Sequence, residues 1–145
     1  LLTHLFPFID EYILVDPGKF DLDTTQMKCK YQIRNDYFSD EMAKELSKHY
    51  ADFEILFVSD IRTANHRILS PETTELRIEQ DMENQMKWHE ILNPYKSLLK
   101  FRLPYVGDNK MSKTEVEYLD GRIYFQTWEG KTSSETRLLV SRPYK

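Results

Sequence analysis

Cysteine is nearly absent from this chain: of its 145 residues, only Cys29 is a cysteine. A single cysteine excludes an internal disulfide framework and is typical of a reducing compartment. Apolar runs are short, and none approaches the length of about 18 residues that a membrane span requires. The N-terminus also lacks the basic-then-apolar pattern of a signal peptide. The sequence therefore predicts no membrane partner.

Glycine is scarce too, with four residues and no cluster among them, so the sequence contains no glycine-rich phosphate-binding loop. The four histidines are far apart and, with one cysteine, predict no metal site. No serine-nucleophile motif is found. What the chain does contain is 40% apolar and 13% aromatic residues, enough for the core of one domain.

Charge is distributed unevenly. Residues 1–95 carry 10 basic and 18 acidic side chains, whereas residues 96–145 carry 10 basic and 6 acidic ones. The C-terminal part is thus basic although the whole chain has a net charge of −4. A local basic surface is what a nucleic-acid backbone requires, but ordinary solvated faces show the same asymmetry.

Strands and helices are predicted to alternate along the chain. Strand-like runs are found at residues 12–18, 27–36, 55–60, 97–103, 122–128 and 135–141. Ser39 and Ser70 are expected to cap two helices, the second of which ends near Asn93. This order predicts an α/β fold with a mostly parallel sheet, closed by an antiparallel C-terminal hairpin. The apolar run at 55–60 is expected in the middle of that sheet.

Three charged residues interrupt or border the apolar strands: Asp60, Lys100 and Glu135. In open parallel sheets, ligands lie beyond the carboxyl ends of the strands. An amine between two acids at this edge can orient a sugar hydroxyl and take part in removing its proton. Burial favours the neutral amine and neighbouring carboxylates oppose it. Taken singly, Lys100 reads as a snorkelling lysine and Glu135 as a surface residue.

The flanking motifs carry a resemblance. VSDIR at 58–62, LNPYKSLLKFRLPY at 92–105 and SSETRLL at 133–139 follow LVDPG at 14–18 in the same order and at comparable spacing. This pattern resembles the poxvirus-type cap-specific mRNA (nucleoside-2′-O)-methyltransferases, which are also small regulatory subunits of poly(A) polymerase. The resemblance covers nearly the whole chain. It implies a viral protein with a Rossmann-like, S-adenosylmethionine-dependent methyltransferase fold.

Within that family a Lys-Asp-Lys-Glu tetrad is catalytic, and the resemblance assigns its last three positions to Asp60, Lys100 and Glu135. Lys100 would deprotonate or orient the ribose hydroxyl. The first lysine and the glycine-rich cofactor loop lie upstream in the family and have no counterpart here. The chain also starts with Leu1. We therefore expect residues 1–145 to be a single methyltransferase domain that is N-terminally incomplete and lacks its first strand.

The resemblance implies S-adenosylmethionine as the cofactor. Asp16, at the end of an early strand, would hold its ribose, although an Asp before Pro-Gly is more often a turn former. Ile61 would line the adenine pocket and face Tyr37 or Phe38. These two aromatic residues read equally well as core residues.

Capped mRNA is the substrate that the resemblance implies. Tyr105 would stack on the 7-methylguanine, whose positive charge strengthens the contact, and Asp108 would recognise the guanine edge. Arg62, Arg102 and Arg137 each follow a tetrad residue by two positions. Strand alternation places the last two on the face of Lys100 and Glu135. They are expected to contact RNA or, equally, to form ion pairs with the tetrad acids.

The expected function is methylation of the ribose 2′-oxygen of capped mRNA in the host cytoplasm or the virion. Two alternatives stay open. The chain could be a non-catalytic, RNA-binding processivity subunit whose partner is a poly(A) polymerase catalytic subunit, or a 2′-O-methyltransferase of ribosomal or transfer RNA. The three tetrad residues favour an enzyme, and Tyr105 favours mRNA caps. The acidic helix after Ser70 is expected to be either a partner surface or a solvated face.

Overall fold

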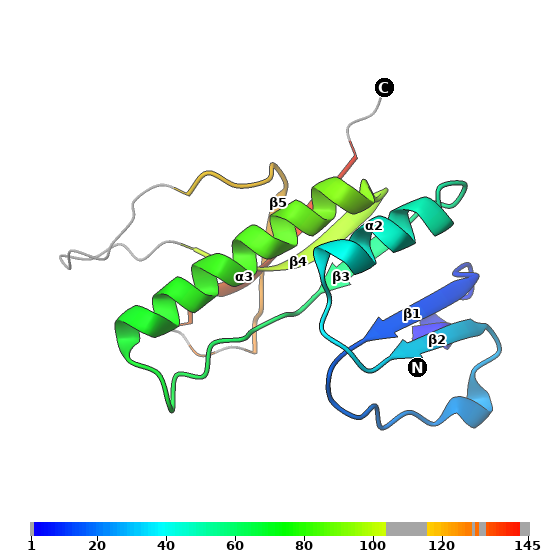
Figure 1. Cartoon of the computed structure of the whole chain (residues 1–145), viewed down its shortest axis with the longest axis horizontal. Coiled ribbons are helices and arrows are strands. Elements are labelled where there is room, and N and C mark those ends of the chain that lie inside the picture. Colours follow the sequence, from blue (N-terminus) through cyan, green and yellow to red (C-terminus); the bar gives the residue numbers. More distant parts are fainter. Residues whose placement is uncertain (1, 104–115, 129, 131–132, 143–145) are drawn as a thin grey trace. The chain divides into compact units, whose positions relative to one another are not determined.

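The computed structural model describes residues 2–103, 116–128, 130 and 133–142 (Figure 1). Contacts within the chain divide it into two compact units, residues 1–42 and 43–145, and each is described by itself. The expectation that they form a single methyltransferase domain stays a prediction. Among the described residues, no helix combines the length and the apolar character needed to cross a bilayer.

The first unit contains a two-stranded parallel sheet. Strands β1 (Glu11–Val15) and β2 (Lys30–Arg34) pair from Glu11 opposite Lys30 to Val15 opposite Arg34. The short helix α1 (Leu2–Leu5) precedes β1, and the 3₁₀-helix η1 (Thr24–Gln26) lies between the two strands. All residues of β1 are half-buried.

Helix α2 (Asp40–His49) begins where the sequence predicts. The hydroxyl of Ser39 accepts a hydrogen bond of 3.2 Å from the backbone N–H of Met42, which satisfies one of the free donors at a helix start. Acidic residues occupy the first turn and basic residues the last turn, as the helix dipole favours. The N-cap prediction is confirmed.

The second unit is built on a four-stranded sheet in the order β3-β4-β6-β5. Its strands are β3 (Leu56–Ser59), β4 (Lys96–Arg102), β5 (Arg122–Phe125) and β6 (Glu135–Ser141). β3 and β4 are parallel, and β6 lies antiparallel between β4 and β5. Among the described strands of this sheet only the β3–β4 pairing is parallel, so the expectation of a mostly parallel sheet holds only in part, whereas the predicted antiparallel pairing of β5 with β6 is confirmed. The mixed α/β class is confirmed, and its Rossmann-like character stays a prediction.

Helix α3 (Pro71–Leu92) covers one face of this sheet and contacts β4 (Figure 1). Both of its ends match the sequence: the Ser70 hydroxyl accepts a hydrogen bond from the Thr73 N–H, and Asn93 ends the helix in the left-handed conformation. Apolar residues at helical spacing are buried, including Ile78, Met82 and Trp88. The acidic helix is thus neither only a partner surface nor only a solvated face, because one side of it closes the core.

Strand β3 departs from the expectation of a strand buried on both faces. Phe57 and Ser59 are buried, whereas Leu56 and Val58 are exposed. Two features explain the alternation. β3 is an edge strand of the four-stranded sheet, and α3 lies on the face to which Phe57 belongs, since His89 of α3 is hydrogen-bonded to Ser97, the β4 partner of Phe57. An apolar run by itself does not show which of its faces another element will cover.

Candidate functional site

Sheet topology brings the three predicted tetrad residues to one edge of the second unit. Asp60 directly follows β3, and Lys100 lies near the end of β4. Because β3 and β4 are parallel, their carboxyl ends share this edge. β6 runs the other way and starts here, with Glu135 opposite Arg102. The end of one strand, the end of its neighbour and the start of a third therefore meet.

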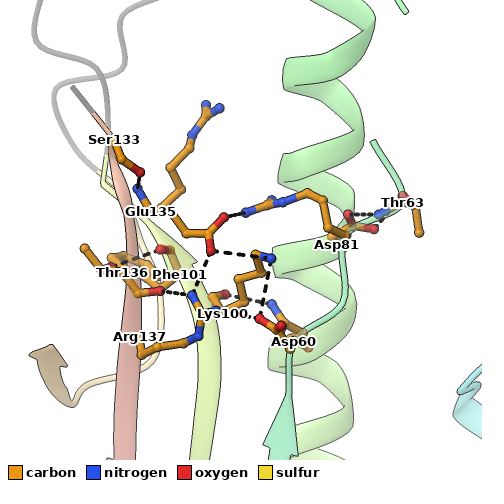
Figure 2. A network of polar contacts seen from close by, with 12 residues as sticks. Asp60, Thr63, Asp81, Lys100, Phe101, Ser133, Glu135, Thr136 and Arg137 are labelled. Atoms are coloured by element: carbon orange, nitrogen blue, oxygen red, sulfur yellow. Dashed lines mark hydrogen bonds and ion pairs between the residues drawn. The ribbon is translucent and has the colours of Figure 1, made fainter. Parts of the chain in front are cut away.

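The amine of Lys100 lies between two carboxylates (Figure 2). Its Nζ is 3.4 Å from Oδ1 of Asp60 and 3.5 Å from Oε1 of Glu135. The Lys100 side chain is 13% exposed, whereas that of Asp60 is 64% exposed. A lysine so shielded from water is rare without an acidic partner, and here it has two. The predicted proximity of the three residues is confirmed, and their catalytic roles stay predictions.

Arg137 joins the same two acids. Its guanidinium donates to Oδ1 of Asp60 at 2.7 Å and to Oε1 of Glu135 at 3.0 Å. In the β4–β6 register Arg137 is directly opposite Lys100, so two basic side chains stand next to one another on the sheet. Two shared carboxylates offset the repulsion between them.

Arg62 adds a third basic side chain, with its NH2 group 3.5 Å from Oε2 of Glu135. We call Asp60, Arg62, Lys100, Glu135 and Arg137 the Lys100 cluster. It contains three basic and two acidic side chains, so its formal charge is positive. For Arg62 and Arg137, the ion pairs with the tetrad acids are present, and contacts with RNA stay a prediction.

Arg102 has a partner that the strand pattern did not predict. Its guanidinium binds both carboxylate oxygens of Glu75 on α3, with NH1 2.8 Å from Oε1. The hydrogen bond from Arg102 lowers the pKa of Glu75. This two-pronged pair ties the end of β4 to the first turns of α3, in the geometry that arginine and carboxylate prefer.

The pKa of Glu135 reflects two opposing effects. Burial acts to raise it, but the hydrogen bond from Arg137 and the surrounding positive charges outweigh burial, and the pKa lies below the ordinary value of 4.5. These charges belong to Lys100, Arg137 and Arg62. Glu135 is therefore ionised at neutral pH and acts as an anchor for the basic side chains rather than as an acid.

Replacement of Glu135 by glutamine is expected to change how stability depends on pH. A carboxylate with a lowered pKa stabilises the folded state above its unfolded-state pKa, and this contribution is lost as the pH falls through the folded-state value. The free energy of unfolding of the native protein should therefore exceed that of Glu135→Gln at neutral pH, and this difference should shrink as the pH falls below about 4.5. Urea unfolding across this pH range measures the effect.

Glu83→Gln is the control for that measurement, since Glu83 is exposed on α3. It removes one surface charge without touching the Lys100 cluster. A stability difference between the native protein and Glu135→Gln that stays constant at all pH values would contradict the ionic role of Glu135.

The predicted cofactor residues are divided between the two units. Asp16, Tyr37 and Phe38 belong to the first, and Ile61 belongs to the second. Asp16 is exposed and accepts a hydrogen bond of 2.7 Å from the backbone N–H of Gly18, so it does act as a turn former. Tyr37 is 69% exposed and is not a core residue, while Phe38 and Ile61 are half-buried. Their roles in binding a cofactor stay predictions.

These residues supply only part of a site for S-adenosylmethionine. The exposed carboxylate of Asp16 can accept hydrogen bonds from ribose hydroxyls, and the Tyr37 ring is free of covering residues on most of its surface. The charged methionine end of the cofactor needs polar partners as well, and the sequence has no glycine-rich loop to supply them. Asp16 and Tyr37 would therefore hold the ribose and adenine end of the cofactor.

Tyr105 and Asp108, the predicted cap contacts, lie outside the described residues. Within the part of the chain that the structure describes, no group of three or more histidine, cysteine or acidic residues is arranged to hold a metal ion.

Two buried polar residues of α3 were missed by the sequence analysis. Asp81 is 2% exposed and accepts hydrogen bonds from the N–H and the hydroxyl of Thr63, just beyond the Lys100 cluster. Gln85 is 1% exposed and donates to the backbone carbonyl of Lys100 at 2.9 Å. Their signal in the sequence is their position on the apolar face of the helix, beside Ile78 and Met82.

Comparison with known proteins adds the family. A family model described as the poly(A) polymerase regulatory subunit matches residues 5–144. No curated protein matches the chain. The matched residues span almost the entire sequence and include every member of the Lys100 cluster. The chain therefore belongs to the poly(A) polymerase regulatory subunit family.

Proposed function

We propose that this protein is a non-catalytic, RNA-binding regulatory subunit that works with a poly(A) polymerase catalytic subunit. The family match over residues 5–144 carries the proposal. In this role the subunit would keep the polymerase on its RNA, and it would bind the RNA strand without sequence specificity. The proposal extends to a viral origin and to the host cytoplasm or the virion as the place of action.

The Lys100 cluster supports RNA binding. Arg62, Lys100 and Arg137 share two carboxylates, which leaves an excess of positive charge at an edge of the sheet. Lys100, Glu135 and Arg137 belong to the basic part of the sequence, in which 10 basic residues outnumber 6 acidic ones from residue 96 onward. Basic groups that neutralise phosphates supply most of the affinity of sequence-independent binding. The acidic partners hold the basic groups in fixed positions.

A second candidate is methyl transfer to the ribose 2′-oxygen of capped mRNA, and the placement of Lys100 favours it. The amine is shielded, held by two carboxylates and next to an Asp60 side chain that solvent can reach. In this reaction S-adenosylmethionine would supply the methyl group. Lys100, held by two carboxylates, would orient the hydroxyl, and a nearby carboxylate would receive the proton. The Rossmann-like fold belongs to this candidate.

Substitution of Lys100 by methionine separates the two candidates. Methionine keeps the length and apolar stem of lysine and removes the amine. The full-length protein and the variant would be compared in two assays: poly(A) elongation by the catalytic subunit, and transfer of a labelled methyl group to capped RNA. Lys96→Met is the matched control, since Lys96 lies on the same strand and face of β4.

For a regulatory subunit, Lys100→Met should weaken RNA binding by about fivefold, equivalent to one exposed ion pair, and elongation should still be stimulated. For a methyltransferase, the same change should lower methyl transfer by about 100-fold, because misplacement of the reacting hydroxyl can cost about that much. Lys96→Met should change neither assay by more than about twofold. Failure of the native protein both to bind RNA and to stimulate elongation would refute the regulatory proposal.

A further inference from the structure

We propose that Asp81 is a positioning residue: through Thr63 it fixes the segment that carries Asp60 and Arg62, and so sets the geometry of the Lys100 cluster. The expected effect of Asp81 on RNA binding rests on the proposed function. Its expected effect on the position of the segment that carries Asp60 and Arg62 does not depend on RNA. Asp81 touches none of the cluster residues in the observed hydrogen bonds, so it acts through another residue.

The segment after β3 needs such support. Residues 60–65 belong to no helix or strand, so neither a sheet ladder nor helical hydrogen bonds hold them. Asp60 and Arg62 lie in this segment, and both reach toward β4 or β6. Thr63 follows directly and is attached to α3 twice, by its N–H at 2.8 Å and its hydroxyl at 2.7 Å (Figure 2).

Asp81 is well suited to this role because it is buried. At 2% exposure, its carboxylate is shielded from water, and burial of a carboxylate without partners is strongly unfavourable. Hydrogen bonds to a charged acceptor are short and strong. Release of Thr63 would leave the carboxylate without these two donors, so the attached position of the segment is strongly preferred.

The same helix holds the other half of the cluster. Gln85 follows Asp81 by four residues, so the two side chains lie on one face of α3, and Gln85 donates to the Lys100 carbonyl. α3 is capped at both ends and has 22 residues. One helix therefore contacts both β4, which carries Lys100, and the segment after β3, which carries Asp60. The β3–β4 register, in which Ser59 pairs with Leu99, places Asp60 beside Lys100 at 3.4 Å, and α3 contacts the chain on both sides of this pair.

Four substitutions test the inference in the full-length protein. Asp81→Ala removes both acceptors. Asp81→Asn keeps one acceptor for the Thr63 N–H and offers an amide N–H to the Thr63 hydroxyl, which can accept, so it should preserve the attachment. Thr63→Val removes the hydroxyl at constant shape, and Thr63→Ser retains it. Met82→Ala is the control, because it opens a cavity in the same turn of α3 without touching the segment.

The first readout is amide hydrogen exchange of residues 61–65 in the free protein. We expect it to be faster at least tenfold in Asp81→Ala, faster to a smaller extent in Thr63→Val, and close to native in Asp81→Asn and Thr63→Ser. Met82→Ala should lower global stability and speed exchange throughout the second unit. The ratio between the exchange rate of residues 61–65 and that of the rest of the unit should stay as in the native protein. This comparison separates positioning from general destabilisation.

The second readout is the salt dependence of RNA binding. Loss of an ordered Arg62 should remove about one phosphate contact, which lowers the slope of log affinity against log salt by about 0.7 for single-stranded RNA. Asp81→Ala should show this change and Met82→Ala should not. Native exchange in Asp81→Ala, or equal effects in Met82→Ala, would overturn the inference. If the native protein does not bind RNA, the proposed function fails, and the exchange data alone decide the role of Asp81.

Discussion

Reversal of the charge of Arg137 to glutamate is expected to weaken RNA binding by about 10- to 100-fold. In the native protein the Lys100 cluster has three basic and two acidic side chains. Arg137→Glu makes it two basic and three acidic, so the edge of the sheet would repel phosphates. A hydrogen bond to a charged group is worth about 1.5–3 kcal/mol, which corresponds to this range of affinity.

Fluorescence anisotropy with a labelled single-stranded RNA at low salt measures the change, since screening reduces it at high salt. Arg77→Glu is the control, because Arg77 is exposed on α3 and reversal of its charge alters the net charge equally. Circular dichroism verifies that both variants are folded. Equal losses of affinity in the two variants would show that RNA senses only the total charge of the protein and that the Lys100 cluster has no special part in binding.

Truncation of Leu99 to alanine is expected to give the largest loss of stability, about 2–5 kcal/mol in the free energy of unfolding. Leu99 is completely buried in β4, where it pairs with Ser59 of β3 and Leu138 of β6. α3 covers this face of the sheet, so the neighbours of the removed methyl groups cannot close the space fully. Denaturant unfolding of the native and substituted proteins measures the difference.

Leu76→Ala is the matched control for that experiment. It removes the same atoms from a leucine that is 66% exposed on α3, and alanine is at least as good a helix former as leucine. The free energy of unfolding should change by less than about 0.5 kcal/mol. A small effect at Leu99 would contradict the position of β4 at the centre of the core, and with it the buried backbone from which Lys100 extends.

Most of the helices and strands were predictable because their signals are local. Ser39 and Ser70 cap helices through hydrogen bonds to residues three positions ahead, and Asn93 ends α3 by its own backbone conformation. Such interactions depend only on neighbours in the sequence. The strands likewise follow short apolar runs. Burial was less predictable: Val58 belongs to an apolar run and is nevertheless exposed on the side of β3 that α3 does not cover.

The candidate site was predictable in part. Asp60, Lys100 and Glu135 were expected to meet because each borders or interrupts a strand, and they do meet. The ion pairs of Arg137 required the register in which it faces Lys100. Asp81 was missed because an acid on an apolar helix face looks unfavourable until its partner is known, and that partner, Thr63, is 18 residues away.

Amino-acid order alone thus specified where α2 and α3 begin, where α3 ends, roughly where the strands lie, and which charged residues approach one edge of the sheet. These properties arise from capping, from hydrophobic periodicity and from the alternation of side chains along a strand. Only the folded chain decided which face of β3 stays open, how three basic side chains share two carboxylates, and that Asp81 and Gln85 attach both sides of the Lys100 cluster to one helix. These contacts join residues far apart in sequence, and their energies depend on burial and distance, which exist only once the elements have packed.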